Sequence, residues 1–508
     1  MKRCTLATAL VGLFLMAGLQ NATAEPTGRL ITQNDAQRHG LRRAWFSQVR
    51  LKSGRSRLSH LRLAEGTGKL PDTLFAQTDQ GVIQAIDAET GQTLWVRGVG
   101  ARNHPTMAIS ASNELVGVLN GTRLYLLDRS DGRVLWERKI NGVPVDGPVL
   151  TDKFACVPTL SGRILAYEIK KRKFDKEEED SDAEKIARAM KDKDSEKSDS
   201  GPSETTLASL TKPVKNGGPL ALDYESVYPL TCVSFGQVAC QPIFLLEDNK
   251  NQYLAWSTNK GLFVGYVDLQ RQNEFAVSFQ LRTHSEIVTQ PTYLPPAVGN
   301  GNAEGLIFAA SKLGHVYAVS AMRGTEKWNY AIGQPIAEPV IPIKDRVYVI
   351  TRLGNLFCLD AMTGLECWST GGVGQFLASS GKKIYVADRF GQIRVLDAQS
   401  GSTVDGLFAA SLPIKLRNQW TDRIYLASPS GLVQCLHETS LSKPIYYRKT
   451  GQGPVEGGEE FVPDQQGQNE EKPDETGKSE GGSPFDEPDG GGGSPFDEPD
   501  GGGASPFD

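Results

Sequence analysis

Two short apolar segments joined by a glycine-containing turn recur along most of the chain. Two examples are RVYVITRLGNLFCLD, residues 346–360, and RIYLASPSGLVQCLH, residues 423–437. Apolar and polar positions alternate within each segment, and Val, Ile, Tyr and Phe are frequent at the apolar positions. A period of two residues is typical of β-strands, and the turn makes each unit a hairpin. The pattern therefore predicts a fold built from one repeated β-hairpin.

The hairpin occurs eight times at a nearly constant spacing. Aligning the units on the last residue of the second segment gives eight anchors: Asp87, Asp128, Glu168, Asp268, Ser320, Asp360, Asp397 and His437. Successive anchors are 41, 40, 100, 52, 40, 37 and 40 residues apart. A period of about forty residues with several strands per repeat is typical of propeller blades. We therefore expect an all-β fold, an eight-bladed β-propeller, with one large insertion and one smaller one.

The turn after each anchor has its own chemistry. An aspartate at the anchor can accept hydrogen bonds from backbone amides two residues on, and a glycine four positions later supplies a positive φ. The predicted turn-forming residues are Asp87 with Gly91, Asp128 with Gly132, Asp360 with Gly364, and Asp397 with Gly401. We expect these aspartates to be structural rather than catalytic or metal-binding, because each one lies in a different blade.

Tryptophans follow several of these turns at a fixed distance. Trp95, Trp136, Trp328 and Trp368 each lie four residues after the turn glycine, and we expect them to wedge between neighbouring blades. Trp45 has a similar context but lies ahead of the first repeat, whereas the last hairpin lacks a following tryptophan. We therefore expect the Trp45 strand to complete the last blade, which closes the ring and removes two exposed sheet edges.

The repeats AIDAETGQTLW, LDAMTGLECW and LDAQSG resemble those of the pyrroloquinoline-quinone-like (PQQ-like) propeller family. The resemblance covers about residues 40–445 and implies the propeller fold. It implies either of two functions, because the family includes quinone-dependent dehydrogenases and non-enzymatic scaffolds. Among the scaffolds, the propeller subunit of the outer-membrane β-barrel assembly machinery matches the chain in length and blade number. The chain departs from that subunit in lacking a lipoprotein cysteine and in carrying a long insertion and a tail.

Motifs typical of catalysis are missing from the sequence. There is no His-Glu-x-x-His pair, no Gly-x-Ser-x-Gly, no phosphate-binding glycine loop and no Cys-x-x-Cys, and the six histidines lack ligand spacing. Resemblance to the quinone dehydrogenases implies a vicinal cysteine pair, yet no two cysteines are adjacent. We therefore predict a protein that is not an enzyme and has no cofactor or metal. The alternative is a quinone-dependent oxidoreductase or a quinone-binding protein.

Two cysteine pairs are candidates for disulfides. Cys358 and Cys367 lie symmetrically about the Ala361–Gly364 turn, so we expect them to face each other across one hairpin. Cys232 and Cys240 flank VSFGQVA in a similar way. Each pair is open to two interpretations, a disulfide or side-by-side packing of two small apolar residues. The remaining two cysteines of the mature chain, Cys156 and Cys435, are expected to be buried and free.

The N-terminal 24 residues are typical of a secretory signal. A basic start, Lys2 and Arg3, precedes an apolar run, and the segment ends in Ala22-Thr23-Ala24. We expect cleavage between Ala24 and Glu25 and export to the periplasm. The alternative interpretation is a membrane anchor, but the apolar run is shorter than the roughly 18 residues of a spanning helix, so we expect no transmembrane helix in the mature chain.

The C-terminal segment is acidic and rich in glycine and proline. From Gly451 onward it has 16 acidic residues and two lysines, and it repeats the sequence SPFDEPDGGG. Such a composition predicts disorder. The repeats are interpreted either as a spacer or as a docking motif anchored by Phe485, Phe496 and Phe507. The chain before this segment has a formal charge near +9 but gathers no basic arm or motif, so we expect no binding of nucleic acid.

These observations divide the chain into a ring and its attachments. The predicted parts are a signal peptide (1–24), an N-terminal segment (25–41), the propeller (42–445), a charged, largely disordered insertion between blades three and four (171–216), and the tail (446–508). A rigid ring with variable loops favours binding over catalysis. We predict a monomeric, exported scaffold at the inner face of the outer membrane, whose partners are proteins, in particular components of outer-membrane barrel assembly.

Overall fold

The computed structural model describes residues 28–51, 55–170, 228–270, 274–287, 289–296, 304–336 and 338–447. The predicted signal peptide, the charged insertion and the tail from residue 448 onward lie outside these ranges. The disorder predicted for the insertion and the tail concerns residues outside the described part of the chain, and it stays a prediction.

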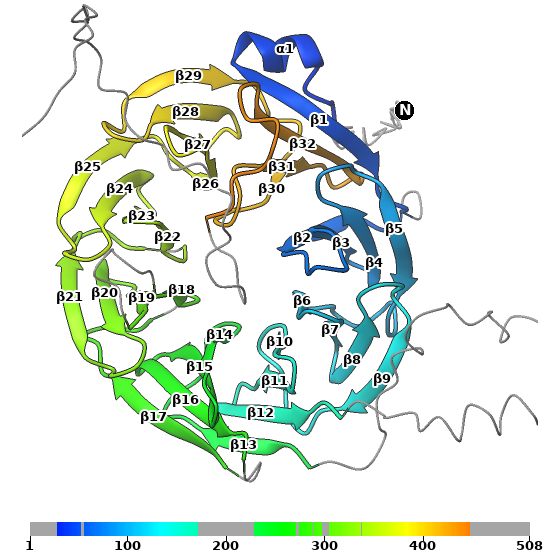
Figure 1. Ribbon diagram of the computed structural model, residues 1–508, viewed down its shortest axis with the longest axis vertical. Helices are drawn as coiled ribbons and strands as arrows, with labels where there is room; N and C mark the ends of the chain where they lie inside the picture. Colours follow the sequence, from blue (N-terminus) through cyan, green and yellow to red (C-terminus); the bar gives the residue numbers. More distant parts are fainter. Residues whose placement is uncertain are drawn as a thin grey trace, which may run out of the picture. The chain divides into compact units, whose positions relative to one another are not determined.

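The described residues form eight four-stranded antiparallel sheets, arranged as blades around a ring (Figure 1). Blades 1 and 2 consist of β2 (Leu58–Ala64), β3 (Thr73–Thr78), β4 (Val82–Asp87) and β5 (Thr93–Gly98), and of β6 (Ser110–Ala111), β7 (Leu115–Asn120), β8 (Arg123–Asp128) and β9 (Val134–Lys139). Blades 3 and 4 consist of β10 (Val149–Leu150), β11 (Phe154–Pro158), β12 (Arg163–Glu168) and β13 (Leu230–Val233), and of β14 (Ile243–Glu247), β15 (Asn251–Thr258), β16 (Gly261–Asp268) and β17 (Phe275–Leu281).

The second half of the ring repeats this plan. Blades 5 and 6 consist of β18 (Thr292–Leu294), β19 (Leu306–Ala310), β20 (His315–Ser320) and β21 (Glu326–Ala331), and of β22 (Ile341–Ile343), β23 (Arg346–Ile350), β24 (Asn355–Asp360) and β25 (Glu366–Gly371). Blade 7 consists of β26 (Gln375–Ser379), β27 (Lys383–Ala387), β28 (Ile393–Asp397) and β29 (Thr403–Leu407). With blade 8, described below, the predicted eight-bladed all-β propeller is confirmed.

The last blade is built from both ends of the ring. Its strands are β30 (Ile414–Lys415), β31 (Ile424–Ala427), β32 (Leu432–Glu438) and β1 (Leu41–Gln48), and β1 pairs antiparallel with β32 so that Trp45 lies opposite Cys435. The predicted closure by the N-terminal strand is confirmed. A short helix that the sequence analysis did not foresee, α1 (Gln33–Arg38), precedes β1, and the Thr32 hydroxyl caps it by accepting from the Asp35 amide.

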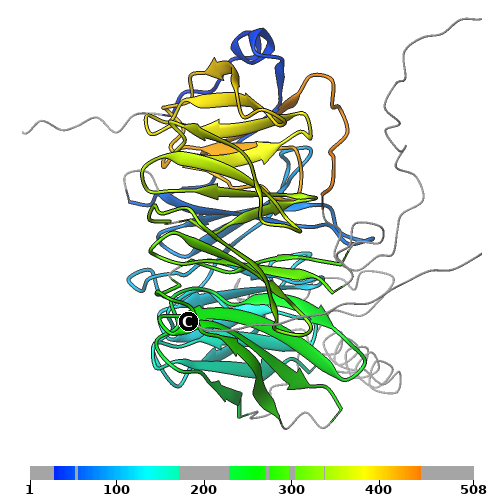
Figure 2. The same cartoon turned by 90° about the vertical axis from the view of Figure 1, so that its left-hand side faces the viewer.

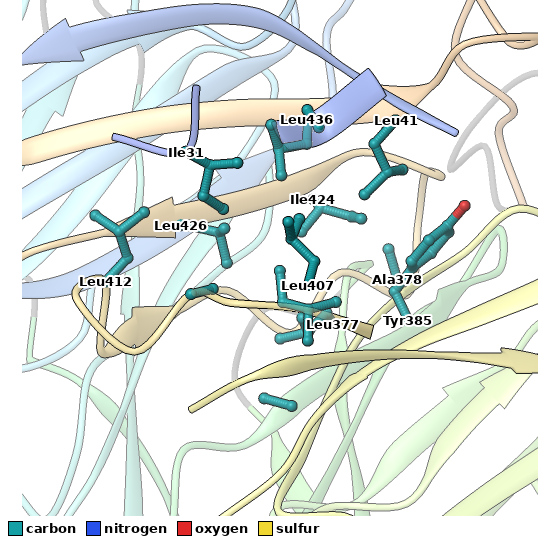
Figure 3. Close-up of a cluster of buried hydrophobic side chains, with 14 of the residues drawn as sticks. Ile31, Leu41, Leu377, Ala378, Tyr385, Leu407, Leu412, Ile424, Leu426 and Leu436 are labelled. Atoms are coloured by element: carbon teal, nitrogen blue, oxygen red, sulfur yellow. The ribbon is translucent and has the colours of Figure 1, made fainter. Parts of the chain in front are cut away.

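The hydrophobic core lies between the blades and is divided into eight clusters, one at each junction. Figure 3 shows the cluster between blades 7 and 8, where Leu377 of β26 packs near Leu426 and Leu436 of blade 8. Alternate residues of one strand serve two junctions. On β23, Val347 and Val349 face blade 5, whereas Tyr348 and Ile350 face blade 7. Each sheet is thus covered on both faces, and successive residues of its middle strands are buried in different junctions.

The insertion lies inside a blade, and the prediction that it separates blades 3 and 4 is wrong. β13 pairs with β12 in one sheet, with Cys232 opposite Ile164. Residues 171–227 therefore connect the third and fourth strands of blade 3. The long step between anchors did not reveal this position, because a single short strand, LTCV, follows the insertion and carries no tryptophan.

The ring has two faces that differ in the kind of connection they carry (Figure 2). Because the four strands of a blade alternate in direction, the first and third turns of every blade lie on one face, which we call the Asp-turn face. The second turn and the connector to the next blade lie on the other face, which we call the hairpin-tip face. After β32 the chain crosses the Asp-turn face, where the Tyr447 hydroxyl donates to the carbonyl of Ser379 of blade 7 at 2.7 Å.

Candidate partner-binding face

The predicted turn-forming aspartates and glycines all lie on the Asp-turn face. In the turn of blade 6, the Asp360 Oδ1 atom accepts from the amides of Met362 at 3.0 Å and Thr363 at 2.9 Å, and Gly364 has a φ of 73°. Asp87 and Asp397 accept from the two corresponding amides and Asp128 from the amide of Ser130, and Gly91, Gly132 and Gly401 have similar φ values. These carboxylates do not come together; each is used within its own turn.

Four of the five predicted tryptophans join one blade to the turn of the next. Their indole Nε1 atoms donate to a backbone carbonyl at 2.8–3.0 Å: Trp45 to Ala88, Trp95 to Arg129, Trp328 to Ala361 and Trp368 to Ala398. Their rings cover the turn glycines, so that an added Cβ on Gly91, Gly132, Gly364 or Gly401 would lie only 2.3–2.5 Å from a ring atom. Glycine is therefore required twice, by the positive φ and by the tryptophan.

The fifth tryptophan and a phenylalanine occupy the junctions near the insertion. Trp136 of blade 2 packs edge-on against Tyr167 of blade 3, with ring centroids 5.9 Å apart. In blade 4 the position of the tryptophan is taken by Phe279, whose ring lies 2.5 Å from a Cβ built on Gly324. The sequence analysis missed Phe279, because it follows its anchor Asp268 by 11 residues, whereas the four tryptophans within the repeats follow theirs by 8.

All six described cysteines are free thiols in this structure, and the choice between a disulfide and side-by-side packing stays a prediction for Cys358 and Cys367. Cys232 lies on β13 of blade 3, whereas Cys240 lies in the connector to blade 4 beside Ser257, so the expectation of one shared hairpin is wrong. Cys358 lies on β24 opposite Trp368, and its thiol is in hydrogen-bond contact with that of Cys367, which lies at a bulge in β25. Burial raises the pKa of the Cys358 thiol to about 12, which disfavours the thiolate needed for exchange.

The hairpin-tip face exposes an apolar patch at blades 3 and 4, which consists of Val143, Leu160, Val233 and Phe235. The Phe235 side chain is 77% exposed. Hydrogen bonds hold these segments side by side, since the Leu160 amide donates to the carbonyl of Val143 at 2.9 Å and the Ser234 amide to that of Gly162 at 2.9 Å. Adjacent apolar side chains on a rigid backbone are typical of a protein-binding surface.

Polar groups connect neighbouring blades beside the innermost strands. Asp146, just before β10, accepts from the Gln241 amide at 3.0 Å, and the Gln290 side chain donates to the carbonyl of Gln241 at 3.1 Å. Burial raises the pKa of the Glu338 carboxyl, against the opposing effect of the Arg417 guanidinium. The two hydrogen bonds link the segments that lead into blades 3, 4 and 5.

Within the described ranges, no group of three or more His, Cys, Asp or Glu side chains has the arrangement of a metal site. The helical content of the same ranges includes no segment with the length and apolar character of a membrane span. The arrangement that remains is an exposed surface on a braced ring, and this surface can bind a partner through apolar contacts.

The comparisons with known proteins agree with this architecture. The family model described as "Outer membrane protein assembly factor BamB" matches residues 25–188 and 282–411. Two relatives have the same description. The protein of Yersinia pestis is 30% identical over 120 residues, 21% of this chain and 29% of the relative, and that of Burkholderia pseudomallei is 26% identical over 96 residues, 19% and 25%. The matches thus span less than a third of each relative.

Solved structures show likeness in fold. BamB from Moraxella catarrhalis has a TM-score of 0.49 at 16% identity, covering 78% of this chain and 98% of that one. Sqt1 of Saccharomyces cerevisiae has a TM-score of 0.51 at 6% identity, covering 76% and 97%. The class of protein is an eight-bladed propeller of PQQ-like repeats. The chain belongs to the family of the outer membrane protein assembly factor BamB, since that family model matches more than half of its residues.

Proposed function

We propose that the protein is an exported, non-enzymatic scaffold that resembles BamB in role, and that it holds protein partners of outer-membrane assembly from the periplasmic side. The observation that carries the proposal is the apolar patch of blades 3 and 4, which lies on a propeller of the BamB family. The sequence features that support export are the basic start, the apolar run and the Ala22-Thr23-Ala24 ending, with cleavage proposed between Ala24 and Glu25.

The patch suits binding because its side chains cost little to immobilise. Val143, Leu160 and Val233 extend from hydrogen-bonded backbone, so a partner would bury apolar area without ordering a loop. Burying such side chains contributes about 25 cal/mol per Å² of apolar surface removed from water. A ring braced by eight packed junctions keeps this surface in one geometry while a partner docks.

The proposal is tested by site-specific photo-crosslinking in intact cells. A crosslinker at Phe235 should capture components of outer-membrane barrel assembly. The matched control is a crosslinker at Leu365, which is 68% exposed but lies on the Asp-turn face. The same experiment on a chain ending at Thr450 shows whether the tail is needed. Two results contradict the proposal: equal capture of these components from Phe235 and Leu365, or no capture of them from either position.

The alternative function, quinone binding or quinone-dependent oxidation, is tested on the purified protein. A thermal melt with and without pyrroloquinoline quinone and calcium should show no saturable shift. A saturable rise in melting temperature, together with oxidation of an alcohol or sugar and capture of an electron acceptor alone in cells, would replace the scaffold with an enzyme.

A further inference from the structure

Three consecutive blades present the same pair of side chains at the tip of the second turn. The tips read SKLGH in blade 5, TRLGN in blade 6 and DRFGQ in blade 7. Each contains a cation followed by a large apolar residue and a glycine. The six tip residues, which we call the cation-apolar row, are Lys312, Leu313, Arg352, Leu353, Arg389 and Phe390. The apolar members are 65%, 61% and 83% exposed in chain order.

The turn geometry forces these side chains outward. In blade 6 the Gly354 amide donates to the carbonyl of Thr351 at 2.9 Å, and the Thr351 amide donates to that of Asn355 at 2.9 Å. Gly354 has a φ of 85°, so the tip is a tight turn closed by a glycine with positive φ. The two central residues, Arg352 and Leu353, make neither of these hydrogen bonds. Gly314 and Gly391 close the tips of blades 5 and 7 in the same way.

The row is continuous across two blades and differs from the other tips. The Arg389 guanidinium of blade 7 reaches the tip of blade 6 and donates to the carbonyl of Arg352 at 3.1 Å. At the corresponding positions, blade 1 has Asp79 and Gln80, blade 3 has Leu160 and Ser161, and blade 8 has Pro429 and Ser430. A shared fold therefore does not require a cation and an apolar residue at the tip.

We propose that the cation-apolar row is a docking site for an acidic segment of a partner protein that carries apolar side chains between its carboxylates. Guanidinium groups pair with carboxylates in a fixed fork, and the adjacent Leu and Phe side chains supply the apolar contact that makes the pairing selective. One nearby carboxylate, Glu286, lies 3.7 Å from the Lys312 ammonium group and would compete for it. The inference rests on the proposed function only in treating the ring as a protein-binding platform.

A suitable probe is a synthetic peptide with the sequence SPFDEPDGGGGSPFDEPD, which combines phenylalanine with carboxylates. Its binding is followed by fluorescence anisotropy, both with the full chain and with the chain ending at Thr450. We expect saturable binding that weakens as salt is added, because exposed charges are screened. Peptides in which Ser replaces Phe, or in which Asn and Gln replace the acids, should bind about tenfold more weakly.

Variants of the protein locate the site. Two triple variants are compared. The Ser variant carries Leu313→Ser, Leu353→Ser and Phe390→Ser, and the Gln variant carries Lys312→Gln, Arg352→Gln and Arg389→Gln. Each should weaken peptide binding at least about tenfold. The matched controls are Leu365→Ser on the Asp-turn face, where the side chain is 68% exposed, and Lys260→Gln in the blade 4 tip, and both should bind like the unchanged protein. Thermal melts must show that every variant is folded.

The outcomes separate this inference from the proposed function. If the peptide binds but the crosslinker at Phe235 captures no assembly component in cells, the docking site at the cation-apolar row is supported and the scaffold role of blades 3 and 4 is contradicted. If the peptide binds saturably neither to the full chain nor to the chain ending at Thr450, the proposed docking site is overturned. A loss confined to the Gln variant, with the Ser variant unaffected, reduces the interaction to unspecific charge attraction and also overturns it.

Discussion

The two faces of the ring carry turns of similar length but use their residues in different ways. On the Asp-turn face, Asp360 accepts from two amides of its own turn, and the Trp328 ring covers Gly364. On the hairpin-tip face of the same blade, Arg352 and Leu353 extend into solvent. The side chains of the Asp turn make contacts within the molecule, whereas those of the hairpin tip are exposed and can contact a partner.

The comparison teaches how to interpret a repeat. Residues that recur in most blades, such as the aspartate and glycine of the anchor turn, satisfy the geometry that every blade shares. Residues that vary among blades at one structural position are free of that geometry. The hairpin tips vary most, so they are the positions where a partner can be selected. Changes on the Asp-turn face should therefore cost stability, and changes on the hairpin-tip face should cost binding.

The largest effect is expected when the ring cannot close. Deletion of residues 25–55 removes α1 and β1, leaving β32 with an open edge and the blade 8–blade 1 cluster without Trp45. This should remove most of the roughly 5–15 kcal/mol of a typical folding free energy and lower the melting temperature of the whole ring in circular dichroism. The control is the chain ending at Thr450, which should melt within about two degrees of the full chain. A ring that melts unchanged without β1 is not closed by it.

Single tryptophans should rank next. Trp45→Ala removes a buried side chain and its hydrogen bond to Ala88, at a cost of about 4 kcal/mol. Trp328→Ala, within the continuous part of the chain, should cost a similar amount because the same contacts form with blade 6. Denaturant unfolding of both variants measures this. If Trp45→Ala costs far less than Trp328→Ala, the closing junction is weaker than an internal one.

A buried arginine pairs with carboxylates at the closing junction. The Arg423 side chain is 1% exposed and lies 3.1 Å from Glu89 of blade 1 and 3.0 Å from Asp422. It also donates to the carbonyls of Leu441 and Ser442, in the segment that crosses the Asp-turn face. Arg423→Met leaves the buried Asp422 carboxylate, the part-exposed Glu89 carboxylate and the two carbonyls without this partner, and should cost about 3 kcal/mol.

An exposed arginine provides the control for that change. Arg123 pairs with Glu137 on the surface of blade 2, where both side chains are about half exposed. Arg123→Met should cost less than about 1 kcal/mol in the same denaturant titration. Equal costs for the two variants would mean that Arg423 contributes no more than a surface ion pair.

The turn aspartate Asp360 should have a smaller effect that depends on pH. Burial alone would raise the pKa of Asp360, but hydrogen bonds from Thr363 and Met362 outweigh it and lower the pKa below its usual value. A lowered pKa in the folded state means that the stabilisation is complete above the unfolded pKa and is lost as the pH falls through the folded value. Asp360→Ala should therefore cost about 1 kcal/mol at pH 7 and less below about pH 4.

A neutral acceptor tests the origin of that dependence. Asp360→Asn keeps an oxygen in the turn but cannot titrate, so its stability relative to Asp360→Ala should not change between pH 7 and pH 3. Unfolding curves at several pH values measure both variants. A cost for Asp360→Ala that is constant down to pH 3 would show that the charge of Asp360 does not matter.

Much of the ring was predictable because its rules are local and repeated. Alternation gave the strands, the Asp and Gly spacing gave the anchor turns, and the mismatch between Trp45 and the last hairpin gave the closure. What escaped prediction depends on three-dimensional neighbours. Arg423 reads as a surface charge in WTDRIYL, and it is buried only because Glu89 of blade 1 and the carbonyls of residues 441 and 442 surround it.

The binding face was harder to predict for a related reason. Leu313, Leu353 and Phe390 are about forty residues apart, and ordinary hydrophobic patterning assigns such residues to the core. Only the turn geometry shows that they project from one face in adjacent blades. The expected hairpin around Cys232 and Cys240 failed on a similar point, since a blade boundary lies between these two residues.

The smallest expected effect on stability is at a hairpin tip. Leu353→Ser changes a side chain that is 61% exposed and belongs to none of the eight junction clusters, so the free energy of unfolding should change by less than about 0.5 kcal/mol. The matched change on the buried face of the same blade is Val349→Ser, which should cost several times more because Val349 is fully buried between blades 5 and 6. Denaturant titration of both variants gives the difference directly. If Leu353→Ser destabilises the ring as much as Val349→Ser does, the tip packs within the molecule and is not free for a partner.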